Sequence, residues 1–488
     1  MHCIRALFSV ILLASSLSWF ALRSIFLWST NIDDLFGPSV DFEQLKKDWC
    51  RIRRQKVEWK EMLSPCLKIL YNETLANTTR FATDTKNSKV TKMKIMPAGE
   101  HSKIQIQTYF RNGEPKNFGG DAIRVTLRGE TTTAANVWDL GNGQYEAVVL
   151  LMSPGDYIVD VRLDYTMCAG LKDPPMEWFV NAHCSGKWKG IKRVIPRNLL
   201  SNMTEYINGR IAPSLSITVP PARYNISELP SLIFGLDCGL PCNLFWDGHG
   251  EWSSDGKQWR PYIPMDLDVK NMMLSDKPWS RGHEPRKGNL WIYGDSISYY
   301  FYQSVEHKVL CKKIFRKCMV TYNWLYPKTL YDVTHTCADV DLNVTLVKNY
   351  LENVTGRNDM DDSSVLLFNA GAHYVKNTSF KKYRETIDAL IEAIKETYNG
   401  TAIWRSSTAI HKQSLPIMGS FRRYITSQRV QLFNAYANAA MCNADILVLD
   451  AQPLTSSYPH GTKDGIHYKD HVLRPIERIF QHALVYGS

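Results

Sequence analysis

Roughly the last 200 residues alternate between short apolar runs and longer amphipathic segments, and this alternation constrains the fold more than any other feature. The apolar runs are LWIY (290–293), MVTYNW (319–324), SVLLFNA (364–370), TAIWRSS (401–407) and ILVLDA (446–451). Helix-like segments lie between them, the clearest being SFKKYRETIDALIEAIKETY. Apolar strands separated by helices are typical of a parallel sheet covered on both faces. We therefore predict a three-layer α/β domain over residues 287–486.

The first of these strands runs into Gly294, Asp295 and Ser296, and active sites in such sheets lie where strands end. A serine hydroxyl is a poor nucleophile until a base takes its proton, and a carboxylate usually orients that base. Near the C-terminus, Asp464 and His467 stand three residues apart in KDGIHYKD. In a turn this spacing puts both side chains on one side. The pattern predicts Ser296, His467 and Asp464 as the catalytic residues, with Gly294 and Asp295 in the supporting turn.

A serine nucleophile also needs donors for the oxyanion that forms on the attacked carbonyl. Ser296 would open a helix, where backbone N–H groups are free to bind an anion. Asn369 and Gly371 follow another strand in FNAGAHY and offer a side-chain amide and a backbone N–H. We predict Ser296, Asn369 and Gly371 as the oxyanion site.

Each of these features also has a plainer structural interpretation. The stretch 294–296 fits a strand-to-helix turn with an N-cap, and Asp464 fits a surface turn. Among the other histidines, His460 and His471 compete for the role of base, whereas His373 suits packing. The occurrence of a serine, an Asn-x-Gly and an Asp-x-x-His in this order within one α/β domain favours the catalytic interpretation.

Upstream, the hydrophobic period changes to two. KIQIQTYF (103–110), DAIRVTLRG (121–129) and GQYEAVVLLMSPGDYIVDVRL (143–163) alternate between apolar and polar residues and are separated by Gly-rich turns. Short strands at this spacing indicate a β-sandwich. We assign this N-terminal β-sandwich to residues 96–222, with SLSITVPP (214–221) as its last strand.

Residues 223–286 are rich in Trp, Gly, Pro and Asp, and we expect them to connect the two domains. His249 has no second His or Cys at metal-ligand spacing, so we expect a surface loop there and no metal site. Cys238 and Cys242 lack the CxxC spacing of a redox pair and suit disulfide partners instead.

The N-terminus predicts entry into the secretory pathway. Residues 1–28 contain an uncharged stretch, Ala6 to Leu22, that is typical of a signal peptide or an uncleaved signal anchor. We favour a type II anchor with a lumenal body; a secreted protein is the alternative. The polar residues 29–95 are expected to form a stem.

Sequons and cysteines agree with a lumenal location. Eight N-x-[ST] sequons occur, at Asn72, Asn77, Asn202, Asn225, Asn343, Asn353, Asn377 and Asn399. Of the eleven cysteines, ten follow Cys3, and an even lumenal number suits disulfides.

Composition excludes some functions. The net charge is +10, and the basic clusters RIRRQK (51–56) and KVLCKKIFRK (308–317) lie far apart in the chain. A nucleic-acid binder concentrates its charge and stacking aromatics on one module, so we expect no nucleic-acid partner. The chain has no Walker A loop, dinucleotide fingerprint or HExxH motif, and we expect no bound cofactor.

The Gly-Asp-Ser turn at 294–296, paired with Asp464 and His467, resembles the PC-esterase branch of the GDSL/SGNH hydrolase superfamily. FNAGAH resembles that family's Asn block, and CNLFWDGHGEW (242–252) is similar to the entry of such domains. A filamin-type immunoglobulin-like (E-set) domain followed by a PC-esterase domain is similar to the NXPE (neurexophilin and PC-esterase) family, over roughly residues 96–486.

The resemblance implies an O-acetyltransferase or acetylesterase that acts on glycan hydroxyls through an acyl-serine intermediate. Acetyl-CoA or another acyl donor would be a substrate, and a glycan or glycoprotein would be the acceptor. The type II topology resembles that of Golgi glycan-modifying enzymes, which favours the transferase and implies that the N-terminal segment contacts the Golgi membrane. An alternative of a different class is a secreted or membrane-tethered, neurexophilin-like binding protein with an inactive hydrolase-like domain.

Overall fold

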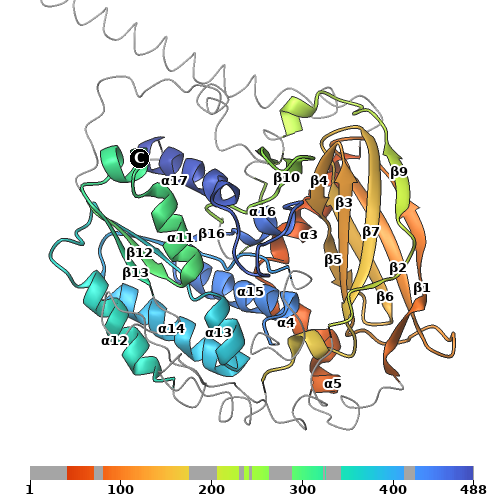
Figure 1. Ribbon diagram of the computed structural model, residues 1–488, viewed down its shortest axis with the longest axis horizontal. Helices are drawn as coiled ribbons and strands as arrows, with labels where there is room; N and C mark the ends of the chain where they lie inside the picture. Colours follow the sequence, from red (N-terminus) through yellow and green to blue (C-terminus); the bar gives the residue numbers. More distant parts are fainter. Residues whose placement is uncertain are drawn as a thin grey trace, which may run out of the picture.

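The computed structural model describes residues 41–70, 81–174, 206–229, 233, 236–240, 244–262, 288–322, 325, 342–411 and 424–486. The described residues form two halves: one consists of antiparallel sheets, and the other of a sheet covered by helices. α3 (Phe42–Arg54) and α4 (Trp59–Leu63) lie between these two halves (Figure 1). The predicted signal segment lies outside the described residues. Among the described helices, none has the length and apolar character needed to span a membrane.

The second half contains a five-stranded sheet in which every neighbouring pair is parallel, in the order β13-β12-β14-β15-β16. The strands are β12 (Leu290–Gly294), β13 (Cys318–Tyr322), β14 (Val365–Phe368), β15 (Thr401–Arg405) and β16 (Leu447–Leu449). β12 and β14 are buried along their whole length, as strands covered on both faces should be. The five apolar runs of the sequence thus form the five strands, which confirms the predicted parallel sheet.

Helices cover both faces of this sheet. Figure 1 shows α11 and α17 on one face and α12, α14 and α15 on the other. Their bounds are α11 (Ser296–Val305), α12 (Val344–Thr355), α14 (Phe380–Thr397), α15 (Ser427–Asn443) and α17 (Arg474–Tyr486), with the short helices α13 (Ala372–Asn377) and α16 (Gln452–Ser456) at strand ends. The first strand, β12, lies between the second and the third, so the strand order reverses at β12 and β14. Ligands in open α/β sheets bind at such a switch point.

Two antiparallel sheets form the other half, one in the order β1-β2-β6-β5 and one in the order β11-β10-β4-β3-β7-β8, with β9 paired to β7. The strands are β1 (Thr83–Lys94), β2 (His101–Phe110), β3 (Ala122–Gly129), β4 (Thr131–Ala134), β5 (Asn136–Asp139), β6 (Gln144–Leu150), β7 (Gly155–Tyr165), β8 (Gly209–Arg210), β9 (Leu215–Val219), β10 (Gly250–Ser253) and β11 (Trp259–Pro261). One apolar cluster contains Ile104 and Tyr145 from the first sheet and Val125 and Val159 from the second. The alternating side chains therefore place one face of each sheet in a shared core.

The prediction that residues 29–95 form a stem is wrong for those of them that the structure describes. Thr83–Lys94 forms β1, which pairs with β2 in an antiparallel ladder. β1 is an edge strand, and most of its side chains face solvent, so its polar composition resembles that of a linker. Leu45 and Trp49 of α3 are buried, so this helix packs as part of the folded body.

The segment predicted to connect two domains, 223–286, is bonded to both halves where it is described. β10 pairs with β4 of the larger antiparallel sheet, whereas Trp246 forms a parallel bridge with Leu449 of β16. The indole N–H of buried Trp252 donates to the carbonyl oxygen of Leu454 at 2.8 Å. This segment therefore ties the two halves together through backbone and side-chain hydrogen bonds.

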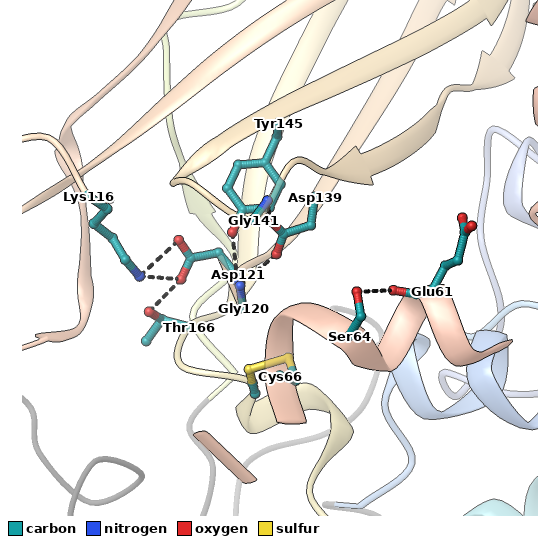
Figure 2. Close-up of a disulfide and its surroundings, with 11 residues drawn as sticks. Glu61, Ser64, Cys66, Lys116, Gly120, Asp121, Asp139, Gly141, Tyr145 and Thr166 are labelled. Atoms are coloured by element: carbon teal, nitrogen blue, oxygen red, sulfur yellow. Dashed lines mark hydrogen bonds and ion pairs between the residues drawn. A yellow bond between two sulfur atoms is a disulfide. The ribbon is translucent and has the colours of Figure 1, made fainter. Parts of the chain in front are cut away.

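Three disulfides join described residues: Cys50–Cys238, Cys66–Cys168 and Cys311–Cys318. The expected pairing of Cys238 with Cys242 is wrong, because Cys238 bonds Cys50, which lies 188 positions away in the sequence. Figure 2 shows the Cys66–Cys168 bond beside a group of hydrogen-bonded polar side chains. Several disulfides in one chain are typical of an oxidising, secretory or extracellular compartment.

Candidate active site

Three side chains from distant parts of the chain meet where the parallel strands end. Ser296 is the first residue of α11, directly after β12, whereas Asp464 and His467 lie in the loop that precedes α17. Ser296 Oγ lies 2.8 Å from His467 Nε2, and His467 Nδ1 lies 2.8 Å from Asp464 Oδ2. The structure thus brings together the three residues that the sequence singled out, in the order hydroxyl, imidazole, carboxylate.

The Asp464 carboxylate fixes the orientation of the imidazole. Its Oδ1 accepts the backbone N–H groups of Ile466 and His467 at 3.1 and 2.9 Å, while Oδ2 faces the ring nitrogen. Burial acts to raise the pKa of the Asp464 carboxyl, but the hydrogen bonds from the His467 backbone and ring outweigh it and lower the pKa to about 2. An ionised Asp464 at neutral pH favours the tautomer with its proton on Nδ1, which leaves Nε2 to accept a proton from Ser296.

Asp295 holds the turn that presents Ser296. As the N-cap of α11, its Oδ1 accepts the backbone N–H of Ile297 at 3.0 Å, and its Oδ2 accepts the backbone N–H of Ala372 at 2.9 Å. Asp295 therefore ties the start of α11 to the start of α13, and hence the end of β12 to the end of β14. The first N–H groups of a helix have no acceptor within the helix, so the Ser296 N–H is not used by α11.

Two glycines permit this close approach. A Cβ atom on Gly371 would lie 2.0 Å from Asp295 Oδ2, and one on Gly294 would lie 2.4 Å from Ser298 Oγ. Real Cβ atoms do not come this close to other heavy atoms, so a larger residue at either position would displace the turn. Glycine is therefore required at positions 294 and 371, because a side chain at either position would clash with its neighbours.

Asn369 lies at the end of β14, only 3% exposed. Its Nδ2 donates to the carbonyl oxygen of Arg405 at 2.8 Å, which fixes the amide plane and uses one of its two N–H groups. Gly371 follows as the N-cap of α13. The predicted oxyanion residues thus stand at the ends of two adjacent strands, Ser296 after β12 and the other two after β14.

Arg405 is a residue of this region that the sequence analysis does not identify. It ends β15, is 1% exposed, and its Nη2 donates to Ser298 Oγ on α11 at 2.9 Å. Burial lowers the pKa of its guanidinium to about 10, with the Asp295 charge acting in the opposite direction, so Arg405 stays a cation at neutral pH. A charged residue that ends an apolar strand is the signal that could have identified it, because strand ends line the active sites of such sheets.

An exposed aromatic residue borders the site. Tyr300 of α11 is 41% exposed, and its ring lies edge-to-face against the His467 imidazole, with centroids 5.3 Å apart. The neighbouring Tyr299 stacks on Tyr322 with centroids 5.1 Å apart. An exposed aromatic ring therefore borders the imidazole that contacts Ser296.

The other histidines have different positions. His460 Nε2 lies 2.9 Å from the carbonyl oxygen of Asp255, and His471 Nε2 lies 3.0 Å from the Tyr458 hydroxyl. His373 is half-buried on α13. Within the described ranges, no group of three or more His, Cys, Asp or Glu side chains is arranged to hold a metal ion.

The expectation that His249 lies in a surface loop is wrong. His249 is 7% exposed, because the segment that carries it packs between the two halves of the protein. Composition predicted a loop there, but the burial of that loop depends on contacts far away in the sequence.

Five of the eight sequons fall on described residues. Four of these asparagines are exposed: Asn225, Asn343, Asn353 and Asn399. Asn377 is the exception, with 2% exposure at the end of α13. A glycan on a buried Nδ2 has no room in the folded protein, so the prediction for Asn377 does not fit the structure. Asn72, Asn77 and Asn202 lie outside the described residues.

Glycopeptide mapping after expression in a secretory host is therefore expected to find Asn377 unmodified. Asn399, an exposed sequon in the same half of the protein, serves as the matched control and is expected to carry a glycan. A glycan attached to Asn377 in correctly folded protein would contradict the burial of this residue.

No family model and no curated protein matches the chain. Among solved structures, it is similar to a lipase/acylhydrolase from Enterococcus faecalis, with 13% identity, a TM-score of 0.26 and coverage of 41% of this chain and 93% of that one. A gut microbial diltiazem-metabolizing enzyme has 12% identity, a TM-score of 0.28 and coverage of 42% and 48%. A peptidoglycan O-acetylesterase has 7% identity, a TM-score of 0.23 and coverage of 82% and 76%. All three TM-scores are below 0.5, so the site geometry carries the functional proposal.

Proposed function

We propose that this protein is an SGNH-type O-acetyltransferase or acetylesterase with Ser296 as its nucleophile. The observation that carries the proposal is the chain of two 2.8 Å contacts from Ser296 through His467 to Asp464, at the switch point of a parallel sheet. A hydroxyl, an imidazole and an ionised carboxylate in this order are what activation of a serine at neutral pH requires.

In the first half-reaction, Ser296 Oγ attacks the carbonyl carbon of the acyl donor, and its proton passes to His467 Nε2. Asp464 Oδ2 accepts the hydrogen bond from Nδ1–H and stabilises the imidazolium. The carbonyl oxygen takes the negative charge and is stabilised by the Ser296 N–H, Asn369 Nδ2 and the Gly371 N–H. The donor's bond to its leaving group then breaks, His467 gives its proton to that group, and an acetyl ester remains on Ser296.

In the second half-reaction, an acceptor hydroxyl attacks the acetyl ester while His467 Nε2 removes its proton. The acetyl group leaves on the acceptor oxygen, and the proton returns to Ser296 Oγ. Water as acceptor gives an esterase, and a sugar hydroxyl gives a transferase. Both reactions use the same residues of this chain.

We favour transfer from acetyl-CoA or another acyl donor to a glycan hydroxyl, in the lumen of the secretory pathway. The exposed ring of Tyr300 beside His467 supports a glycan acceptor, because aromatic side chains suit the apolar face of a sugar. The three disulfides and the four exposed sequons support a lumenal location. Residues 1–28 would anchor the chain in the Golgi membrane, and the antiparallel half, proposed to be a filamin-type immunoglobulin-like domain as in the NXPE family, would orient the glycan.

The second candidate is a neurexophilin-like binding protein with an inactive hydrolase-like domain. The exposed aromatic surface at Tyr300 would serve a binding protein as well. The alignment of Ser296, His467 and Asp464 favours the enzyme, because binding alone does not need a serine held 2.8 Å from an oriented imidazole.

Covalent labelling separates the two candidates. The purified full-length protein is expected to react with a fluorophosphonate probe at Ser296, and Ser296→Ala should abolish the label. Ser304→Ala, on the same helix, is the matched control and should label normally, since Ser304 Oγ donates to the carbonyl oxygen of Phe301. Equal labelling of wild type and Ser296→Ala, or none in either with no acetyl turnover, would favour the binding protein.

Replacing Asn369 with alanine is expected to lower kcat by about 10²–10³-fold, since one oxyanion donor is lost. Asn289→Ala is the matched control: Asn289 is equally buried and donates to the carbonyl oxygen of Asp359 at 2.7 Å, but it precedes β12, at the opposite end of the sheet. Both variants should lose stability, by about 1–3 kcal/mol in chemical denaturation. Similar losses of kcat in the two variants would remove Asn369 from the oxyanion site.

A further inference from the structure

A cavity of about 480 Å³ lies between the two halves of the protein, apart from Ser296, His467 and Asp464, none of which lines it. Its lining comes from α3, from the antiparallel strands, from the loop before β10, from α15 and from the residues that follow β16. α4 also contributes to the lining, and Figure 1 shows α3 and α4 between the antiparallel sheets and α15. The volume is within the range of small-ligand sites, about 300–1,000 Å³.

Three aromatic residues with unpaired nitrogens meet in this lining. The ring centroid of Trp49 lies 6.5 Å from that of His101 and 6.1 Å from that of His249. The indole N–H of Trp49, both ring nitrogens of His101 and Nε2 of His249 have no hydrogen-bond partner among the described residues. All three residues are more than nine-tenths buried. Because buried polar groups are nearly always hydrogen-bonded, this cluster needs a partner that the described chain does not supply.

The cavity is also lined by an unpaired hydrogen-bond acceptor and by an ion pair whose two charges compensate each other. Asn438 of α15 donates through Nδ2 to the carbonyl oxygen of Lys56 at 3.2 Å, whereas its buried Oδ1 has no partner in the described part of the chain. The Lys56 ammonium lies 3.6 Å from the Asp450 carboxylate, so its charge is already compensated. Burial lowers the pKa of His101 to about 4 and also lowers the pKa of His249, so both rings are neutral at pH 7.

The lining near the Cys66–Cys168 disulfide differs. There, Lys116 Nζ donates to the Asp121 carboxylate at 3.0 Å, and the backbone N–H of Asp121 donates to the Tyr145 hydroxyl at 2.8 Å (Figure 2). These polar groups satisfy one another without a ligand. One buried acceptor at this end, Gln428 Oε1 near Gly170, also has no partner among the described residues. Most of the unpaired lining atoms nevertheless belong to the cluster of Trp49, His101 and His249.

We infer that this cavity is a second binding site, for a neutral, hydroxyl-rich ligand of the saccharide class. Hydroxyl groups both donate and accept hydrogen bonds. They therefore match an indole donor, two neutral imidazoles and the side-chain amide oxygen of Asn438. The three rings supply apolar surface for the C–H face of a sugar. A charged ligand would find Lys56 and Asp450 already paired with each other.

The site lies on the same edge of the parallel sheet as Ser296. Asp450 follows β16, which is three strands from β12 in the sheet order, so these two strands lie about 14 Å apart. A saccharide in the cavity would therefore be bound at the same edge of the sheet as the reacting serine, and its binding does not require acyl transfer.

Binding to the purified full-length protein tests the inference with two neutral probes, methyl β-galactoside and methyl N-acetyl-β-glucosaminide. Saturation-transfer NMR and calorimetry are expected to show saturable binding of at least one probe. Trp49→Phe removes the indole N–H, and His249→Phe removes both ring nitrogens. Each variant keeps an apolar ring, and each should weaken binding about tenfold. Trp59→Phe, a substitution outside the lining, and Ser296→Ala should bind as wild type does.

Hydrogen exchange on the wild-type protein provides a second measurement that needs no variant. The probe is expected to slow exchange in α3 and around 247–252, with α11 unchanged. Absence of saturable binding would mean that water alone fills the cavity, which overturns the inference. Loss of binding in Ser296→Ala, with normal binding in Trp49→Phe and His249→Phe, would place the saccharide at the catalytic serine and equally overturn it. Neither result depends on whether the protein transfers acetyl groups.

Discussion

Replacing Ser296 with alanine is expected to lower kcat for acetyl transfer and for acetyl-ester hydrolysis by about 10⁴–10⁶-fold. His467→Ala should have a loss of the same size, and the double variant should be no worse than either single one. The reason is that the hydroxyl and the imidazole, 2.8 Å apart, act as one unit: without the base the serine is not activated, and without the serine the base has no proton to take.

Initial rates with a glycan acceptor and with a simple acetyl ester check this prediction, with folding monitored by circular dichroism. Ser304→Ala and His471→Ala are the matched controls and should keep near-normal rates, since Ser304 and His471 have other hydrogen-bond partners. Additive losses in the double variant would mean that Ser296 and His467 act independently.

Asp464→Asn is expected to lower kcat by about 10⁴-fold while leaving the fold intact. An amide at this position can donate a hydrogen bond to Nδ1, which favours the tautomer with its proton on Nε2, and that tautomer cannot accept the proton of Ser296. The lowered pKa of Asp464, about 2, means that the wild-type carboxylate stays ionised across the neutral range.

The matched control for Asp464 is Asp470→Asn, an exposed aspartate near the start of α17, which should keep normal activity. NMR of the His467 ring nitrogens should show the proton on Nδ1 in the wild type and on Nε2 in Asp464→Asn. An Asp464→Asn enzyme with wild-type kcat would show that the carboxylate does not set the tautomer.

The strands of the parallel sheet could be predicted because the relevant information is local. The runs that form β12 and β14 are buried along their whole length and so are apolar throughout. The meeting of Ser296 with Asp464 and His467 could be predicted for a chemical reason: these residue types have a known joint use, and strand ends of one sheet lie together. Their distances depend on the tertiary fold.

Long-range pairings could not be predicted in the same way. β1 is a polar edge strand, and its sequence does not distinguish it from a linker. The bond between Cys50 and Cys238 spans 188 positions, and cysteine spacing does not determine a partner at that separation. The burial of His249 and Arg405 likewise follows from contacts between distant segments, so composition predicted a loop for the first and gave no role to the second.

The assignment of Ser296 as the acylated nucleophile is tested most directly by intact-protein and peptide mass spectrometry after brief reaction with an activated acetyl ester and an acid quench. We expect a mass gain of about 42 Da, corresponding to one acetyl ester, located on the peptide that contains Ser296. It should be absent in Ser296→Ala and present in Ser304→Ala. An acetyl group on another residue, or an equal gain in folded Ser296→Ala, would contradict the assignment.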